Sequence, residues 1–114
     1  MINIRLPWPP TVNTYYTIAR GRKILSKKGR DYKKYAMPLW TGDLVSGQVE
    51  VNIEAHPPDK RKRDLDNILK PILDLLTNNG VWKDDSQVDV LRIRRRHIAK
   101  PGYVRVYITE IGDD

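Results

Sequence analysis

The stretch "QVEVNIEAH", residues 48–56, constrains the fold most, because apolar and polar residues alternate through it without a break. Successive side chains of a β-strand point to opposite faces, so this period of two places the apolar residues together. They are Val49, Val51, Ile53 and Ala55. Pro57 and Pro58 follow and stop the pattern, since proline cannot donate a ladder hydrogen bond. We therefore expect a strand with one apolar face over residues 49–56.

Other segments also have strand patterns. Residues 2–6, "INIRL", alternate in the same way and are followed by "PWPP". Residues 15–26, "YYTIARGRKILS", are typical of a small hairpin that turns around Gly21. The segments "QVDVLRIRRRHI" and "YVRVYITEI", residues 87–98 and 103–111, are separated by "AKPG". We expect these last two to pair as a C-terminal hairpin.

A first helix is expected after Ser26, whose hydroxyl can cap it. Its apolar residues recur at the spacing of one buried helix face. This face comprises Tyr32, Tyr35, Ala36, Leu39 and Trp40. Pro38 lies within the pattern and should kink or end the helix, because proline lacks the backbone N–H that the helix needs. A surface loop, "TGDLVSG", then leads to the next strand.

A second helix is expected to begin close to Asp66 or Asn67, because Pro71 is tolerated only near a helix start. Gly80 is a natural residue just past its end. The predicted buried face comprises Ile68, Leu69, Ile72, Leu73 and Leu76. With 114 residues, of which 39 % are apolar, the chain suits one small hydrophobic core. The sequence thus predicts a single α+β domain over residues 1–114, with a mixed or antiparallel sheet and two helices.

The charge composition indicates a nucleic-acid partner. Lys and Arg number 21 against 14 Asp and Glu, a net charge of +7, as expected of proteins that bind phosphate-rich partners. No apolar run approaches the roughly 20 residues that span a bilayer, and no signal peptide follows Met1, so we expect a cytoplasmic protein with no membrane partner. The chain has no cysteine, so a metal would be held by oxygen or imidazole.

The most informative motif is "KRKRDLDNILK", residues 60–70, in which two aspartates follow four cations. If the chain is extended through "DLD", Asp64 and Asp66 face the same way and can share one metal ion, and Lys70 lies one helical turn beyond Asp66. A second acidic pair, Asp84 and Asp85, follows the helix in "VWKDDSQV" and could return to the first. Carboxylates gathered at one place repel one another, and a bound Mg²⁺ ion would offset this repulsion. Mg²⁺ also activates water for phosphodiester hydrolysis.

Structural roles for the same residues remain open at this level. An isolated "DxD" near a helix start is more often a cap and dipole partner than a metal site. The basic run could be a solvated loop. "RIRRR", residues 92–96, could be a strand edge protected by charge. We expect His56 and His97 to be ordinary strand residues, and the tryptophans Trp8, Trp40 and Trp82 to be core or interface anchors.

The motifs "KRKRDLDNILKPILDLL" and "NNGVWKDDSQV", with "LPWPPTVNTYY" at the start and "ITEIG" at the end, resemble the RusA family of Holliday junction resolvases. The resemblance implies a homodimeric endonuclease that depends on Mg²⁺, with Mn²⁺ as a substitute, and introduces paired nicks into four-way junctions during recombination and repair. It implies essential carboxylates at Asp64, Asp66 and Asp85 and a catalytic lysine at Lys70. Asn67 and Asp84 also match the motifs.

The expected partners are four-way junction DNA and a second copy of the chain, because a twofold dimer matches the twofold symmetry of a junction. The residues expected to contact DNA are Lys60, Arg61, Lys62, Arg63, Asn67, Arg92, Arg94 and Arg96. Two other functions remain open: a DNA- or RNA-binding protein without catalysis, and a Mg²⁺-dependent nuclease for flaps or other branched DNA.

Overall fold

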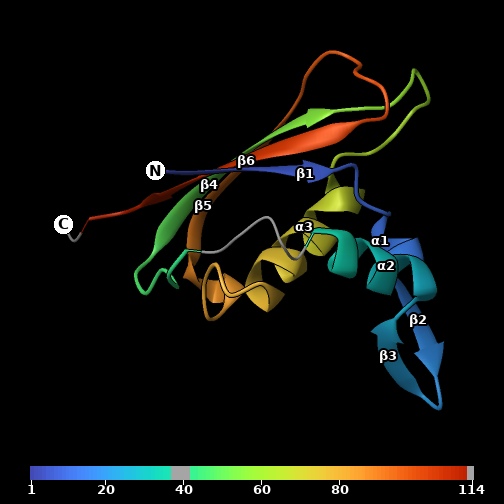
Figure 1. Ribbon diagram of the computed structural model, residues 1–114, viewed down its shortest axis with the longest axis horizontal. Helices are drawn as coiled ribbons and strands as arrows, with labels where there is room; N and C mark the ends of the chain where they lie inside the picture. The colour runs from blue at the N-terminus through green and yellow to red at the C-terminus, as the bar shows by residue number, and fades with distance from the viewer. Residues whose placement is uncertain (37–41, 113–114) are drawn as a thin grey trace.

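The alternating stretch forms β4 (Val49–His56), which lies inside a four-stranded sheet of order β1-β6-β4-β5 (Figure 1). The computed structural model describes residues 1–36 and 42–112. The other strands are β1 (Ile2–Pro7), β5 (Val88–Arg95) and β6 (Tyr103–Glu110). The apolar face of β4 is buried as predicted, with at most 1 % of each apolar residue exposed. The strands predicted at residues 2–6 and 49–56 are confirmed.

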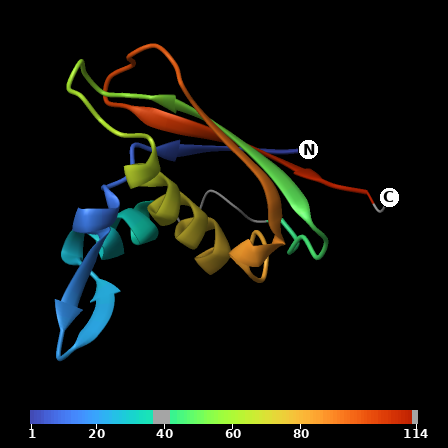
Figure 2. The ribbon, with the colours of Figure 1, turned by 180° about the vertical axis from the view of Figure 1, so that it is seen from behind.

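The predicted C-terminal hairpin is wrong, although both of its strands exist. β5 pairs with β4 in parallel, and β6 pairs antiparallel with β4 and with β1 (Figure 2). β4 therefore lies between the two strands that were expected to be partners. The reason is the helix between β4 and β5, because a crossover helix returns the chain to the same end of the sheet and makes the two strands parallel. The sheet is mixed.

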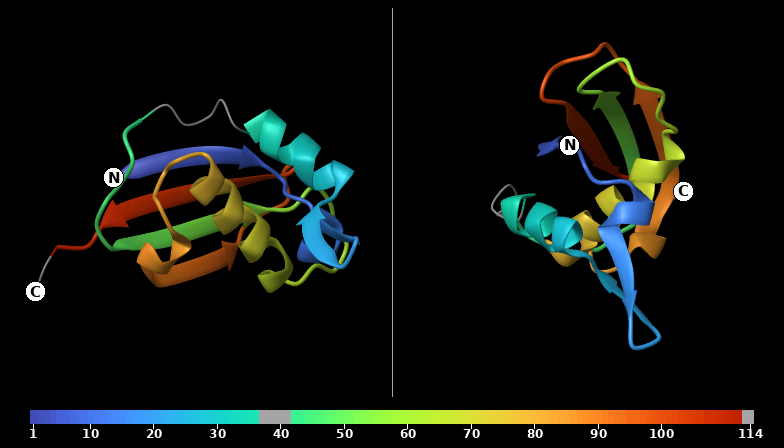
Figure 3. Two further views of the ribbon diagram at one scale, coloured as in Figure 1. Left: turned by 90° about the horizontal axis from the view of Figure 1, so that it is seen from below. Right: turned by 90° about the vertical axis from the view of Figure 1, so that its right-hand side faces the viewer.

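This crossover helix is α3 (Asp66–Asn78), which packs on the apolar face of the sheet (Figure 3). It begins where predicted and contains Pro71 near its start. Its buried residues are Ile68, Pro71, Ile72, Leu75 and Leu76, whereas the predicted Leu69 and Leu73 are only half-buried. Gly80 follows the C-cap residue Asn79 with a φ of +76°, as expected of a residue just past a helix end.

The N-terminal half contains α1 (Val12–Tyr15), β2 (Tyr16–Ala19), β3 (Arg22–Leu25) and α2 (Lys27–Ala36). β2 and β3 form the predicted hairpin, a separate two-stranded sheet that projects away from the main sheet in Figure 1. The Ser26 hydroxyl accepts a hydrogen bond from the Gly29 amide at 3.0 Å, so the predicted cap of α2 is confirmed.

The predicted buried face of α2 is confirmed only at Tyr32. Its hydroxyl donates to the Pro7 carbonyl oxygen at 2.6 Å, and its side chain is buried. Tyr35 is 76 % exposed, so its predicted burial is wrong: one turn on, α2 has no core beneath it. The side chain of Ala36, and Pro38, Leu39 and Trp40, lie outside the described residues. No helix in the described ranges is both long and apolar enough to cross a membrane.

Candidate active site and nucleic-acid interface

Asp64 and Asp66 flank the N-cap residue of α3. That residue, Leu65, has helical angles of φ −63° and ψ −33°. The extended conformation of "DLD", on which a shared metal site was made conditional, is therefore not present, because the backbone is already helical at Leu65. Both aspartates are exposed. They remain close neighbours, but the extended geometry that would aim both carboxylates in one direction is not present.

Neither aspartate serves as a side-chain cap. The N-cap of α3 is Leu65, and no side chain donates or accepts a capping hydrogen bond there. Asp66 lies in the first turn, where its charge is favourable to the helix dipole. The capping part of the alternative for the "DxD" motif is thus not supported, because neither carboxylate makes the hydrogen bond of a cap, whereas the dipole part holds for Asp66.

A cleft of about 260 Å³ lies beside Asp64 at the start of α3. Its lining residues are Trp8, Thr11, Lys62, Arg63, Asp64, Asn67 and Ile68. The Arg63 guanidinium carbon lies 5.8 Å from the centroid of the Trp8 ring. The cleft therefore places an aromatic face, two cations and an amide beside one carboxylate, which suits a phosphate-bearing ligand.

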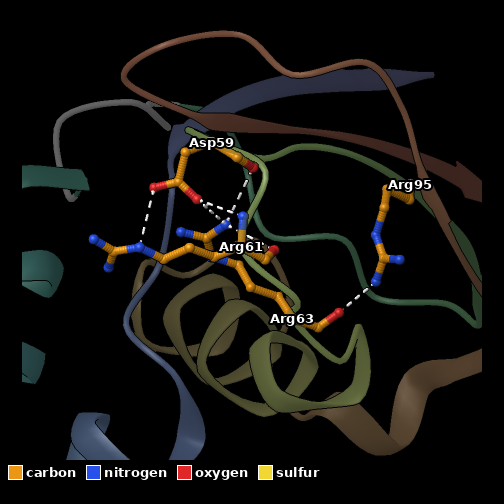
Figure 4. Close-up of polar contacts among 4 residues, drawn as sticks. All are labelled: Asp59, Arg61, Arg63 and Arg95. Carbon is orange, nitrogen blue, oxygen red and sulfur yellow. Dashed lines mark hydrogen bonds and ion pairs between the residues drawn. The ribbon is translucent and has the colours of Figure 1, made fainter.

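The basic run before Asp64 is organised by Asp59 (Figure 4). The Asp59 carboxylate accepts hydrogen bonds from the Arg63 guanidinium at 2.7 Å and from the Arg61 amide at 2.9 Å. These bonds, that of Arg63 first, lower the pKa of Asp59 to about 2. Arg95 of β5 donates to the Arg63 carbonyl oxygen. The Arg63 side chain and the Arg61 backbone amide therefore brace the loop. The alternative of a solvated loop still describes the side chains of Lys60, Arg61 and Lys62, which are exposed.

The arginines of β5 and its continuation are partly neutralised. Arg92 pairs with Glu50 at 3.0 Å, and Arg96 pairs with Glu54 at 3.2 Å. Arg94 is exposed. β5 is an outer strand of the sheet, so the alternative of a strand edge protected by charge is confirmed for this segment. Its contact with DNA stays a prediction.

The two adjacent aspartates after α3 have different environments. Asp84 is the N-cap of the 3₁₀ helix η2 (Asp85–Gln87) and accepts a hydrogen bond from the Ser86 amide at 2.9 Å. Hydrogen bonding from Ser86 lowers the pKa of Asp84. In return, Gln87 Oε1 accepts from the Asp84 amide at 3.2 Å, which completes a capping box. Asp84 therefore has a structural role, whereas Asp85 makes no cap.

The loop that carries Asp85 is anchored by Trp82, which is fully buried. Its indole Nε1–H donates to the Thr77 hydroxyl of α3 at 2.7 Å. Gln87 donates to the carbonyl oxygens of Val45 and Gly47, both at 2.9 Å. The prediction that Trp82 is an apolar anchor is confirmed. These contacts hold the Asp85 turn against the C-terminal half of α3.

Asp74, a residue that the sequence analysis did not single out, interacts with both Lys70 and Asp85. Lys70 Nζ lies 3.0 Å from Asp74 Oδ1, one turn further along α3, rather than over Asp66. Burial raises the pKa of Asp74, and the charge of Asp85 raises it further. Burial, aided by the charge of Asp74, raises the pKa of Tyr15 to about 12. The spacing of four residues between Lys70 and Asp74 is the sequence signal for this pair.

The structure does not gather the predicted carboxylates into a metal site. Within residues 1–36 and 42–112, no three Asp, Glu, His or Cys side chains are placed so that they could hold one metal ion. Asp64 and Asp66 lie at the start of α3, whereas Asp85 is within electrostatic reach of Asp74, two turns along the helix. The three-aspartate centre expected from the sequence is therefore not formed in the single chain.

The two histidines have structural contacts. His56 is buried, stacks on Tyr103 with ring centroids 4.4 Å apart, and contacts the His97 ring edge-on at 4.6 Å. His56 Nδ1 lies 3.0 Å from the His97 carbonyl oxygen. His56 is a strand residue as predicted, whereas His97 lies in the loop after β5. Neither belongs to the candidate site.

Comparisons with known proteins agree on one family. A family model described as "Endodeoxyribonuclease RusA" matches residues 7–109. A relative from Enterobacteria phage 82, named crossover junction endodeoxyribonuclease, is 39 % identical over 116 residues, which cover 98 % of this chain and 97 % of the relative. Relatives of the same name from Shigella sonnei (strain Ss046) and Escherichia coli (strain K12) are each 38 % identical with the same coverage.

Proposed function

This chain belongs to the endodeoxyribonuclease RusA family, and from that premise we propose that it is an endonuclease that resolves four-way DNA junctions. The observation that carries the proposal is the family match itself, which spans every acidic residue of the candidate site. The net charge of +7 supports a polyanionic substrate. The reaction is hydrolysis of a phosphodiester bond, and symmetric resolution requires a paired nick in two strands.

For the chemical step we propose Asp64, Asp66 and Asp85 as the essential carboxylates. Asp64 and Asp66 are exposed and free of capping bonds, which supports this role. Lys70 would stabilise the charge that develops on the reacting phosphate. In the folded chain its ammonium is paired with the half-buried Asp74, so the proposed role requires Lys70 to exchange this partner for the phosphate. The proposed DNA contacts remain Lys60, Arg61, Lys62, Arg63, Asn67, Arg92, Arg94 and Arg96. Of these, Arg63, Arg92 and Arg96 are paired with acids in the folded chain.

The proposed cofactor is Mg²⁺, with Mn²⁺ as a substitute. When bound, such an ion polarises a phosphodiester and lowers the pKa of a bound water. The residue types fit, because Mg²⁺ takes oxygen ligands and commonly uses one or two carboxylates together with waters and substrate phosphates. With no group of three carboxylates among the described residues, the protein alone would supply an incomplete ligand set.

We further propose a homodimer as the active form. A four-way junction has twofold symmetry, and two identical active sites related by a twofold axis would cut opposite strands at equivalent positions. Sedimentation should give a species of about twice the chain mass of 13.3 kDa. A monomer that still makes paired nicks would contradict this part of the proposal.

The test of the function uses a synthetic four-way junction with Mg²⁺, and duplex and flap DNA as controls. The variants Asp64→Asn, Asp66→Asn and Asp85→Asn keep side-chain size but remove the charge, so cleavage should be lost while binding without metal persists. Asp84→Asn is the matched control, because asparagine also serves well as an N-cap and should leave cleavage in place.

The outcomes separate the alternatives. Cleavage of the junction by Asp85→Asn at the wild-type rate would refute the catalytic assignment. Binding without cleavage in any metal would favour a binding protein without catalysis. Preference for flaps over junctions would make the chain a nuclease of other branched DNA.

A further inference from the structure

The net charge of the protein is concentrated in one continuous segment. Residues 20–34 contain eight Lys and Arg and a single acid, Asp31, a formal charge of +7. The whole chain also carries +7, so the remaining residues hold equal numbers of the two signs. This segment comprises the second half of the β2–β3 hairpin and nearly all of α2. None of its cations belongs to the two basic runs, residues 60–63 and 92–96, that the sequence analysis expects to contact DNA.

The charges of this segment are little neutralised in the folded chain. Among the described residues its one ion pair joins Lys27 to Asp31 at 3.9 Å, with the two side chains 86 % and 67 % exposed. The Arg30 guanidinium donates to the Leu25 carbonyl oxygen at 2.9 Å, which fixes its position without cancelling its charge. In contrast, the cations of the other basic runs include several that are paired with Asp59, Glu50 or Glu54.

Residues of β3 and α2 line an open cleft whose composition suits the sugar–phosphate backbone of a nucleic acid. The cleft, of about 470 Å³, is lined by Ile24, Leu25, Arg30, Lys33 and Lys34. The lining combines apolar and cationic side chains, which suit the sugars and the phosphates of a nucleic-acid strand. Figures 1 and 3 show the hairpin projecting beyond the helices and away from the main sheet.

The turn of the hairpin supports a role for charge at its tip. Arg20 and Gly21 have φ angles of +53° and +74°, as a two-residue type I′ turn requires. Glycine or asparagine occupies the first of these positions with less strain than arginine does. A strained arginine at the end of a projecting hairpin is the kind of outlier that points to function.

The same hairpin lies beside α3 at Asp74. Tyr16 and Lys23 line a cleft of about 260 Å³ together with Asp74 of α3, and Lys23 Nζ lies 4.4 Å from the centroid of the Tyr16 ring. Asp74 in turn contacts Lys70 at 3.0 Å. The hairpin therefore lies beside the part of α3 that carries Asp74 and its partner, the proposed catalytic lysine.

We propose that the β2–β3 hairpin and α2 form the main binding surface for the sugar–phosphate backbone of the DNA, and guide one strand toward Lys70 and Asp85. The inference rests on the proposed function for the identity of the polyanion. A second copy of this chain is the less favourable occupant, because a twofold contact would place the same segment of charge +7 against itself.

The first experiment measures DNA binding without metal between 50 and 200 mM salt. Each phosphate that the protein neutralises contributes about 0.9 to the slope of log affinity against log salt. The double variant Lys33→Gln and Lys34→Gln should therefore flatten the slope by up to about 1.8. The matched control is Arg5→Gln, which removes one exposed charge from β1, where the Arg5 guanidinium carbon lies 3.9 Å from the Tyr103 ring centroid. Its slope should match that of the wild type.

The second experiment uses Arg20→Asn, which suits the turn better and removes the charge. Its thermal midpoint should equal or exceed that of the wild type, while DNA affinity falls and the salt slope flattens by about 0.9. A single substitution that maintains stability and weakens binding cannot be explained by damage to the fold. Unchanged affinity, or a decrease in binding that merely follows a decrease in stability, would overturn the role of Arg20.

The inference and the proposed function can fail separately. Wild-type salt slopes in both the Arg20 variant and the lysine double variant would overturn the inference even if the protein cleaves junctions. Absence of cleavage with flattened slopes would overturn the function and leave the binding surface standing. If the lysine double variant instead changes the oligomeric state at an unchanged slope, the surface is an interface between copies and the inference is wrong.

Discussion

Gly29 offers a direct test of how α2 is held against the rest of the chain. A Cβ atom added at this position would lie 2.3 Å from the Tyr15 carbonyl oxygen, a backbone atom that cannot rotate away. Ordinary van der Waals contact begins near 3.4 Å, so the Gly29→Ala variant must move the two backbones apart by about 1.1 Å. The same carbonyl accepts hydrogen bonds from the Ser26 amide at 2.9 Å and from the Ser26 hydroxyl at 3.1 Å.

Two effects of opposite sign act on the free energy of unfolding. Alanine is a better helix former than glycine by about 1 kcal/mol, which favours the variant. Overpacking costs about 1–3 kcal/mol, and the upper end applies here because the clash is with backbone. The clash should therefore win by about 2 kcal/mol, equivalent to a decrease of roughly 8 °C in thermal midpoint.

The assay is thermal and urea unfolding of Gly29→Ala, with Gly47→Ala as the matched control. A Cβ at Gly47 would meet nothing within 4 Å, so that variant should be close to the wild type. DNA affinity should also fall in Gly29→Ala, because α2 and the hairpin base shift relative to each other. If Gly29→Ala is as stable as the wild type or more stable, helix propensity outweighs the contact and the described packing of α2 on Tyr15 is wrong.

Two further predictions concern the ends of α3. Because the carboxylate of Asp59 is favoured in the folded state, its stabilising effect is present above its ordinary pKa of 3.8 and is lost as the pH falls toward 2. The thermal midpoints of wild type and Asp59→Asn should converge over that pH window, whereas a constant difference would contradict the ion pair with Arg63. Trp82→Phe removes the hydrogen bond to the Thr77 hydroxyl and should cost about 1 kcal/mol, a decrease of roughly 4 °C in thermal midpoint. Junction cleavage should fall further than stability does, because the Asp85 turn loses its anchor; equal cleavage by folded protein would show that the turn is held without Trp82.

Local patterns in the sequence determined the elements themselves. The alternation over residues 49–56, the Ser26 hydroxyl before α2, and the glycine after α3 each act within a few residues of the chain, so their effects can be read without the fold. The acidic motif at Asp64 and Asp66 was likewise found from sequence, and so was the start of α3 beside it.

The pairing of strands depended on the whole chain. β5 and β6 are separated by a short loop and each has strand character. β4 nevertheless lies between them, because the α3 crossover joins β4 to β5 in parallel, while β6 pairs with the other edge of β4. Short separation favours a hairpin only when no other strand competes for the same edge. Tyr35 was placed in the core by its helical spacing, but spacing alone does not say where the core beneath a helix ends.

The chemistry of the site shows the same division. Sequence alone determined that acids, a lysine and an excess of cations are present, since residue type and charge do not depend on folding. The tertiary structure decided which of them are free: Asp59 and the glutamates of β4 neutralise several arginines of the evident basic runs, whereas residues 20–34 keep nearly all their charge. It also brought Asp74 of α3 into electrostatic reach of Asp85 in the turn that follows. The physical reason is that a charged side chain attracts a partner less when an opposite charge lies within a few ångströms of it. Only the fold sets which charges are neighbours.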